Sequence, residues 1–258
     1  MKNFFSGIEQ EEIPIRQYVG KSPMFFRKFQ LMAGIYTADL AACKKLMPGS
    51  HAHMLQVLPG RCLIGIHCME YYATDVGPYN EVSISVGISP KQPLFSFPSI
   101  IRSALTQNFH AFILQLPVTT EVAYFGGVDY FNYPKFVANI EFEEQQDKRI
   151  CRLSEQGSNN LILEFEGKKI ATKRTGNGKF KTMTLNSYPI MDGKMVHAQM
   201  CVNTLEMGER FFGSCGKVKI GSGDVADMLS KLDLGKEISY IHAPECRSVM
   251  YLPKPLEK

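Results

Sequence analysis

The chain has 258 residues, of which 45% are hydrophobic and 21% are charged, a composition typical of a globular protein and not of a disordered one. Its 29 basic and 25 acidic residues leave a formal net charge of +4, which is too balanced for a dedicated nucleic-acid-binding protein. No apolar run is long enough to cross a membrane as a helix. The early acidic residues Glu9, Glu11 and Glu12 leave no apolar signal core. We therefore expect a cytoplasmic protein that contacts neither membrane nor nucleic acid.

Two stretches predict helices, and most of the remaining chain predicts strands. A capping hydroxyl or carboxylate, regularly spaced apolar residues and a closing Pro48 predict the first helix over 37–47. Apolar residues at helical spacing before Gly235 predict the second helix over 222–234. A short third helix is expected at 99–105.

Segments rich in β-branched and aromatic residues, bounded by Gly, Pro or Asn, follow one another along the chain. In chain order these expected strands are 26–36, 63–71, 81–88, 110–116, 121–124, 136–142, 151–155, 161–165, 168–173, 180–188, 195–205, 209–220 and 238–252. Turn signals among the later strands are Asn159-Asn160, Glu166-Gly167, Asn177-Gly178 and Asp192-Gly193.

Many short strands at this spacing predict a mainly β, antiparallel architecture that is closed or double-layered. The strand–turn–helix order on which nucleotide-binding loops depend is missing. No linker rich in Pro, Gly or Ser divides the chain, so we expect a single domain over 1–258, with 1–20 as an N-terminal extension.

The seven cysteines show no C-x-x-C spacing. This pattern favours reduced thiols, buried as small apolar side chains, over a disulfide framework or a structural zinc site. His51 and His53 would share one face of a strand, but no third ligand lies at a diagnostic spacing. We therefore expect neither a metal nor a cofactor.

Two places carry residues suited to catalysis. Glu81 stands at the start of an apolar strand and could point into a cavity. Lys135 follows a proline in a segment crowded with aromatic residues, namely Tyr124, Phe125, Tyr130, Phe131, Tyr133 and Phe136. Apolar surroundings disfavour the ammonium form of a lysine and free its amine to attack a carbonyl group. The alternative is a lysine that extends to solvent from a turn, since spacing alone does not show burial.

These residues resemble a known family. Tyr133-Pro134-Lys135, after a Gly-Gly turn, resembles the lysine motif of the acetoacetate decarboxylases. Glu81 lies upstream at a distance that fits the family's active-site glutamate. The segment 35–48 is similar to the family's strand, short helix and following proline. The resemblance spans most of residues 24–145, and the β-rich remainder is compatible with the same fold.

The resemblance implies a fold, a reaction and an assembly. The family's fold is a mainly antiparallel β cone or double barrel with a cavity inside. Its lysine, activated by desolvation or a neighbouring cation, forms a Schiff base with the ketone of a β-keto acid. Lys135 would be that lysine, and Glu81 a carboxylate that moves protons beside it. The resemblance also implies a homo-oligomer.

The sequence departs from the family pattern at three expected positions. A second lysine is replaced by Phe136, and a carboxylate-binding arginine by Phe29, although Arg27 is two residues away. A second glutamate is expected near Ile66. These three positions, together with Arg27, Tyr79 and Tyr133, are the expected substrate-binding residues. Without the arginine, the cavity should prefer a less charged or larger carbonyl compound.

Three functions remain open from the sequence. The leading one is a Schiff-base carboxy-lyase that acts on a β-keto acid through Lys135. The second keeps the same imine but uses it for aldol, retro-aldol or dehydration chemistry on another carbonyl substrate. The third is a non-catalytic carrier of an apolar ligand.

Overall fold

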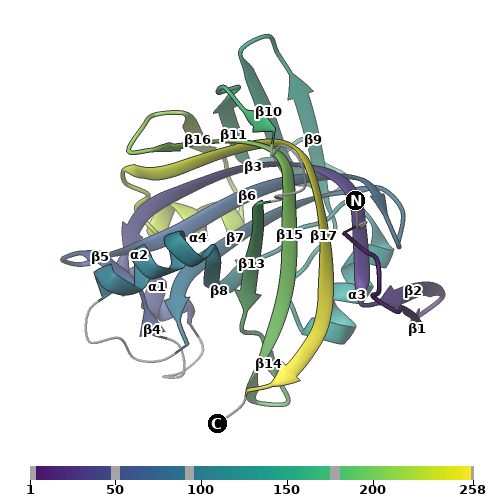
Figure 1. The fold of residues 1–258 in the computed structure, drawn as a ribbon. Coiled ribbons are helices and arrows are strands. Elements are labelled where there is room, and N and C mark those ends of the chain that lie inside the picture. The colour runs from purple at the N-terminus through teal and green to yellow at the C-terminus, as the bar shows by residue number, and fades with distance from the viewer. Residues whose placement is uncertain (1–3, 48–52, 91–95, 175–180, 257–258) are drawn as a thin grey trace.

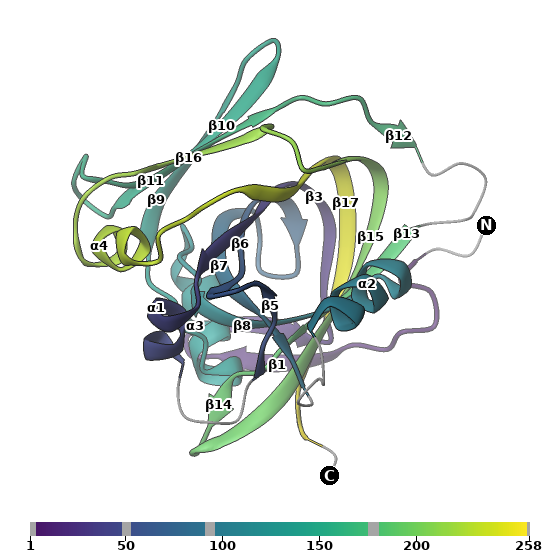
Figure 2. The same cartoon turned by 90° about the vertical axis from the view of Figure 1, so that its left-hand side faces the viewer.

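The computed structural model describes residues 4–47, 53–90, 96–174 and 181–256. A ring of strands forms its centre (Figures 1 and 2). In pairing order these are β7 (Tyr79–Ser89), β8 (Asn108–Gln115), β13 (Lys181–Ser187), β15 (Lys194–Phe211), β17 (Glu237–Pro255), β3 (Met24–Asp39) and β6 (Arg61–Thr74). Because β6 pairs again with β7, the ring closes into a barrel. The β8–β13 pairing is parallel and the other pairings in the ring are antiparallel.

A second sheet covers part of the barrel (Figure 1). Its strands, in pairing order, are β16 (Gly216–Ile220), β11 (Leu161–Lys168), β10 (Lys148–Glu155) and β9 (Ala138–Glu144). The shorter strands are β1 (Glu11–Ile15), β2 (Tyr18–Ser22), β4 (His53–Met54), β5 (Gln56–Leu58), β12 (Lys173–Arg174) and β14 (Ile190–Met191). The helices are α1 (Leu40–Leu46), α2 (Ser96–Thr106), α3 (Glu121–Phe131) and α4 (Asp224–Lys231).

Side chains on β3, β6 and β7 alternate between two separate cores. We call residues that lie directly opposite one another across these strands a rung. One rung, Leu31–Met69–Glu81, points into the barrel. The next residue on each strand points outward: Met32, Cys68 and Val82 pack into a core shared with the second sheet, α1 and α4. This alternation follows from the two-residue period of a strand, and it decides which side chains can line a site.

The helices at 37–47, 99–105 and 222–234 are confirmed in type, with the bounds of α1, α2 and α4. The carboxylate of Asp39 caps α1 by accepting a hydrogen bond from the Ala42 N–H at 2.7 Å. No helix among the described residues is long and apolar enough to span a membrane.

Several expectations about local structure are wrong. Residues 121–124 are the first turn of α3, and the supposed Gly-Gly turn lies inside this helix. Short apolar runs fit both states, and packing on the barrel decides for the helix. Glu166-Gly167 continues β11, and 168–173 is mostly irregular. The strand expected at 209–220 breaks at 212–215.

One of the other turns and the cysteines follow expectation where they are described. The Asp192-Gly193 turn is present, whereas the turn between β10 and β11 is formed by Gln156-Gly157 and not by Asn159-Asn160. The Asn177-Gly178 turn and His51 lie outside the described residues. All seven cysteines are free thiols, and five of them are buried.

Candidate active site

Lys135 reaches the barrel interior because of how α3 ends. Asn132 ends the helix in a left-handed conformation with a φ of 49° and donates its N–H to the helix. The chain then runs beside Val118, whose N–H donates to the Phe136 carbonyl at 3.0 Å. Val118 also forms a β-bridge with Glu81. This pairing brings the segment that carries Lys135 alongside β7.

Lys135 and Glu81 form a buried ion pair. Lys135 Nζ lies 2.6 Å from Glu81 Oε2, and the two side chains are only 6% and 9% exposed. The alternative of a lysine that extends to solvent is therefore excluded. Because two buried charges lose hydration, such a pair is weak evidence for stability and more typical of a functional site.

Three tyrosines surround the pair with neutral hydroxyl groups. Burial and the charge of Glu81 raise the pKa of Tyr71, which also hydrogen-bonds to Glu81. Burial and then Glu81 raise the pKa of Tyr79 in the same way. Burial also raises the pKa of Tyr133, whose hydroxyl lies 2.6 Å from Ser187 Oγ. All three phenols therefore stay protonated near neutral pH.

The Lys135 side chain lies directly against α3 at Gly127. A Cβ at Gly127 would lie 2.1 Å from Lys135 Cε and 3.2 Å from Nζ, which no real side chain tolerates. A Cβ at the neighbouring Gly126 would meet only the Ile15 side chain, at an ordinary 3.4 Å from Cδ1 and 3.9 Å from Cγ2. The glycine at 127 therefore provides the space for the lysine stem.

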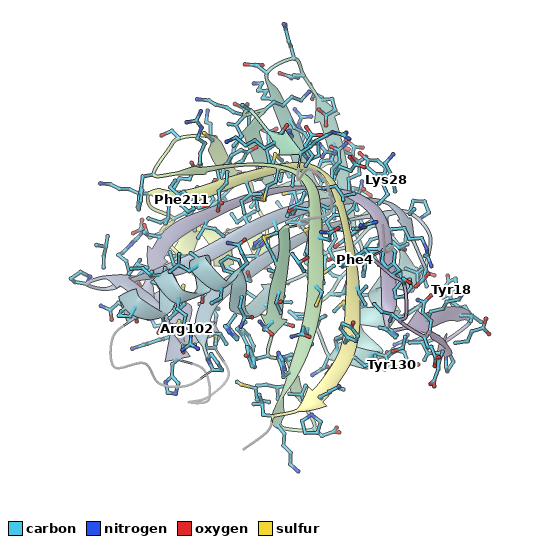
Figure 3. The ribbon with its side chains drawn as sticks, in the orientation of Figure 1. Phe4, Tyr18, Lys28, Arg102, Tyr130 and Phe211 are labelled. Atoms are coloured by element: carbon cyan, nitrogen blue, oxygen red, sulfur yellow. The ribbon has the colours of Figure 1, made fainter. Side chains whose placement is uncertain are left out.

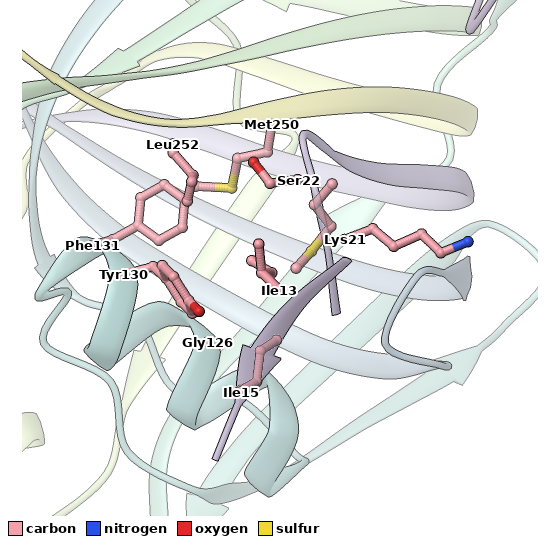
Figure 4. A pocket seen from close by; sticks show the side chains of 10 residues that line it. Ile13, Ile15, Lys21, Ser22, Gly126, Tyr130, Phe131, Met250 and Leu252 are labelled. Carbon is pink, nitrogen blue, oxygen red and sulfur yellow. The ribbon is translucent and has the colours of Figure 1, made fainter. Parts of the chain in front are cut away.

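The hairpin formed by β1 and β2 contacts the side of α3 that faces away from Lys135. Arg16 Nε pairs with Asp129 Oδ2 at 3.0 Å, and the Tyr130 hydroxyl donates to the Pro14 carbonyl. The expected N-terminal extension thus contacts the helix that carries the lysine segment. A small pocket lies between this hairpin, α3 and β17, and neither Lys135 nor Glu81 lines it (Figure 4).

The expected substrate-binding residues divide into two groups. Tyr79, Tyr133 and Phe29 lie on the inner side, and the Phe29 ring is 5.1 Å from that of Tyr71. Arg27 does not face the pair, although we expected it to bind substrate. It is 44% exposed and bonds to Asp75 Oδ1 at 2.5 Å. The neighbouring Lys28 also points outward (Figure 3).

Ile66 and Phe136 pack into the outer core, so neither faces Lys135 and Glu81. Ile66 lies opposite Ile84 on the outward face of β6, and Phe136 takes the side opposite to its neighbour Lys135. The expectation that they contact substrate is therefore not met. Strand alternation is the physical reason in the case of Ile66.

His67 is an inner-face residue that the sequence did not single out. It lies opposite Ser83, two residues along the strands from Met69 and Glu81. Burial lowers the pKa of His67 to about 4, and the smaller effect of the Ser83 backbone raises it. The signal that could have found it is its spacing, since 67, 69 and 71 share one face of a strand.

Comparison with known proteins agrees with this geometry. The family model for acetoacetate decarboxylase matches residues 13–252. The chain belongs to the acetoacetate decarboxylase family. A search of curated protein sequences gave no match.

Solved structures of acetoacetate decarboxylase-like enzymes share the fold. The acetoacetate decarboxylase of Legionella pneumophila subsp. pneumophila str. Philadelphia 1 is 13% identical, with a TM-score of 0.64 over 92% of this chain and 88% of that one. The enduracididine biosynthesis enzyme MppR is 11% identical, with a TM-score of 0.62 over 90% and 87%. An acetoacetate decarboxylase-like enzyme from Sphingomonas wittichii RW1 is 11% identical, with a TM-score of 0.52 over 91% and 93%. The expected mainly β fold is thereby confirmed.

The two adjacent glycines of α3 give a matched pair of substitutions. Gly127→Ala should destabilise the protein by about 1–3 kcal/mol, because the new methyl group displaces the Lys135 stem. Gly126→Ala should be neutral or stabilising by up to about 1 kcal/mol, because alanine favours a helix and finds room. Urea unfolding measures both. Equal effects of the two substitutions would show that the lysine does not occupy the space at 127.

The low pKa of His67 predicts an acid-sensitive contribution to stability. Its folded value of about 4 lies below the ordinary 6.5, so the unfolded chain binds the proton first as the pH falls. The contribution is complete above pH 6.5 and is lost toward pH 4, by roughly 1.4 kcal/mol per unit. The free energy of unfolding, measured with urea between pH 7 and pH 4, should therefore fall more steeply with decreasing pH in the wild type than in His67→Gln. A constant difference would show that His67 is not buried in neutral form.

Proposed function

We propose that this protein is an imine-forming carboxy-lyase that decarboxylates a β-keto acid on Lys135. The observation that carries the proposal is the contact of 2.6 Å between Lys135 Nζ and Glu81 Oε2 in a setting almost closed to water. A proton that moves from the ammonium group to the carboxylate turns this ion pair into a neutral amine and a neutral acid. Low polarity favours that exchange, because it removes two buried charges at once.

The free amine of Lys135 then attacks the ketone carbon of the substrate. The carbonyl oxygen takes a proton from Glu81, and the carbinolamine loses water to give a protonated imine. Glu81 is within hydrogen-bond reach of the nitrogen, as a general acid and base must be. The neutral Tyr71 hydroxyl is a neighbour of this carboxyl group.

Loss of carbon dioxide follows from the charge of the imine. The bond to the carboxylate breaks, its electron pair moves toward the imine nitrogen, and an enamine remains. Glu81 has given its own proton to the carbonyl oxygen, so it passes a proton from the solvent to the α-carbon. Water then hydrolyses the imine to release the ketone and the amine. The carboxylate loses its charge in this step, so surroundings of low polarity assist it.

A second reaction is supported by the surroundings of the pair. Among the described residues, no arginine bonds to Lys135, Glu81 or the three tyrosines, and Arg27 is held by Asp75. A carboxylate substrate would therefore find no second cation. The related MppR was solved with a condensation product of pyruvate and an aldehyde. Aldol, retro-aldol or dehydration chemistry of a less charged carbonyl compound is the second candidate.

We also propose that the protein forms a homo-oligomer. The rings of Phe211 and Phe212 at the end of β15 are 57% and 80% exposed, and Phe211 extends from the surface in Figure 3. A neighbouring copy can cover such apolar surface. Light scattering measures the mass of the assembly, and a monomer at working concentration contradicts this proposal.

Imine formation predicts a single covalent adduct. A keto acid with borohydride should modify Lys135 alone, because no other lysine whose side chain the structure describes is buried to the same extent. Lys148 is the control within the chain: it also pairs with a glutamate, Glu166 at 2.8 Å, but is 29% exposed. Peptide mapping by mass spectrometry locates the adduct. Adducts spread over several lysines, or none with any carbonyl compound, would leave the apolar-ligand carrier as the remaining function.

Measurement of carbon dioxide separates the two reactions. Release of the gas from β-keto acids, abolished by Lys135→Met, is the expected result for a carboxy-lyase. A trapped adduct without gas release would instead favour the aldol or dehydration reaction. Folding of the variant is checked by circular dichroism.

Glu81→Gln should separate binding of the carbonyl from turnover. The amide keeps the size of the carboxyl group but cannot move protons, so turnover should fall by about 100- to 10,000-fold. The adduct on Lys135 should still form, because the amine no longer has a carboxylate that favours its charged form. Normal turnover in the folded variant would reduce Glu81 to a structural residue.

A further inference from the structure

The inner face of the barrel is closed around Lys135 and more open on one side of it. The inner-face residues near Glu81 and toward Tyr71 are buried, namely Phe29, Leu31, Met69, Tyr71 and Tyr79, with exposures of 2–7%. In the opposite direction along the same strands, the partly exposed inner-face residues are Ile35, Leu63, His67 and Ser83. Because these strands belong to a closed ring, the four side chains point toward the barrel interior.

A substrate bound at Lys135 must extend toward this side. The pair His67–Ser83 is the next inward-facing pair after Met69–Glu81, with the outward-facing pair Cys68–Val82 between them. Two residues along a strand correspond to about 7 Å. The part of the substrate that lies several bonds from the ketone carbon therefore meets His67 and Ser83.

His67 offers this part of the substrate hydrogen bonds without charge. Its imidazole is neutral near neutral pH, since burial lowers its pKa to about 4. The backbone of Ser83 engages the ring, and no side chain among the described residues bonds to it. The ring lies over Gly65, where a Cβ would be 2.5 Å from His67 Cε1. The position of the imidazole is thereby restricted while one side of it stays accessible.

We propose that His67, with Ser83 opposite, determines specificity by binding an uncharged polar group of the substrate, such as an amide, a hydroxyl or a second carbonyl. This inference rests on the proposed function, because it places the reacting ketone at Lys135. The neighbouring inner-face side chains Ile35 and Leu63 are apolar and leave the imidazole as the main source of selectivity at this distance. An anionic group gains no counter-charge from the neutral ring and loses its hydration.

Three methyl ketones of equal length test the proposal. The chain in each has four methylene groups between the ketone and a terminal group of similar shape: 6-oxoheptanamide, 6-oxoheptanoate and 7-methyloctan-2-one. The measurement is the concentration that gives half-maximal trapping on Lys135 with cyanoborohydride. The wild type should bind the amide about ten-fold more tightly than the branched apolar ketone, the value of one good hydrogen bond. The carboxylate should be bound most weakly.

Substitutions at His67 should remove this preference and leave trapping intact. His67→Leu should bring the amide and the apolar ketone within about two-fold of each other, and His67→Phe serves if the leucine variant does not fold. His67→Gln should keep most of the preference, since an amide side chain also donates and accepts. His110→Leu is the matched control. His110 is also neutral through burial but lies on the outer face of β8, bonded to the Tyr188 hydroxyl at 2.7 Å.

The outcomes separate this proposal from the proposed function. An unchanged ratio in His67→Leu and His67→Phe, with normal trapping on Lys135, overturns only the role of His67. The same loss in His110→Leu also overturns it, because a general structural effect would then explain the result. Tighter binding of the carboxylate than of the amide by the wild type contradicts an uncharged site. Failure to trap any ketone on Lys135 overturns the proposed function, and this inference with it.

Discussion

A lysine and a glutamate can share a site closed to water only if the protein around them compensates for their lost hydration. Lys135 and Glu81 compensate each other's charge at a distance of 2.6 Å, inside the strands of the barrel. The hydroxyl of Tyr71 bonds to the carboxylate, and aromatic rings exclude water from both groups. In the proposed reaction the same condition activates the pair, because one proton transfer removes both charges.

The lysine owes its position to elements outside the barrel strands. α3 offers a flat surface at Gly127, and its left-handed end at Asn132 returns the chain toward β7. The hairpin of β1 and β2 fixes the outer side of the helix through Arg16 and Asp129. A helix interior is an unfavourable place for two adjacent glycines. A glycine is needed at position 127 because the Lys135 side chain occupies the space that a Cβ would take there.

The sequence was informative where the local pattern is sufficient. The cap at Asp39, the amphipathic α4 and the aromatic setting of Lys135 are all local features. It failed where contacts distant in the chain decide. Apolar and aromatic residues gave 121–124 the appearance of a strand, and only packing on the barrel and the hairpin makes it a helix. The sequence indicated a site residue at Ile66, one position before His67. Only the strand register shows that these two neighbours lie on opposite faces of β6.

The two cores that share β3, β6 and β7 have a consequence for how such a protein can diverge. Even-numbered positions such as Met32, Cys68 and Val82 join the barrel to the second sheet, so most changes there reduce stability. Odd-numbered positions such as His67 and Ser83 face the barrel interior, on the same side as Met69 and Glu81. Substitutions at the inward-facing positions can therefore change the interior, while the outward-facing positions between them are constrained by stability. Such a division is consistent with a fold that is retained in the Legionella acetoacetate decarboxylase and in MppR at 13% and 11% identity.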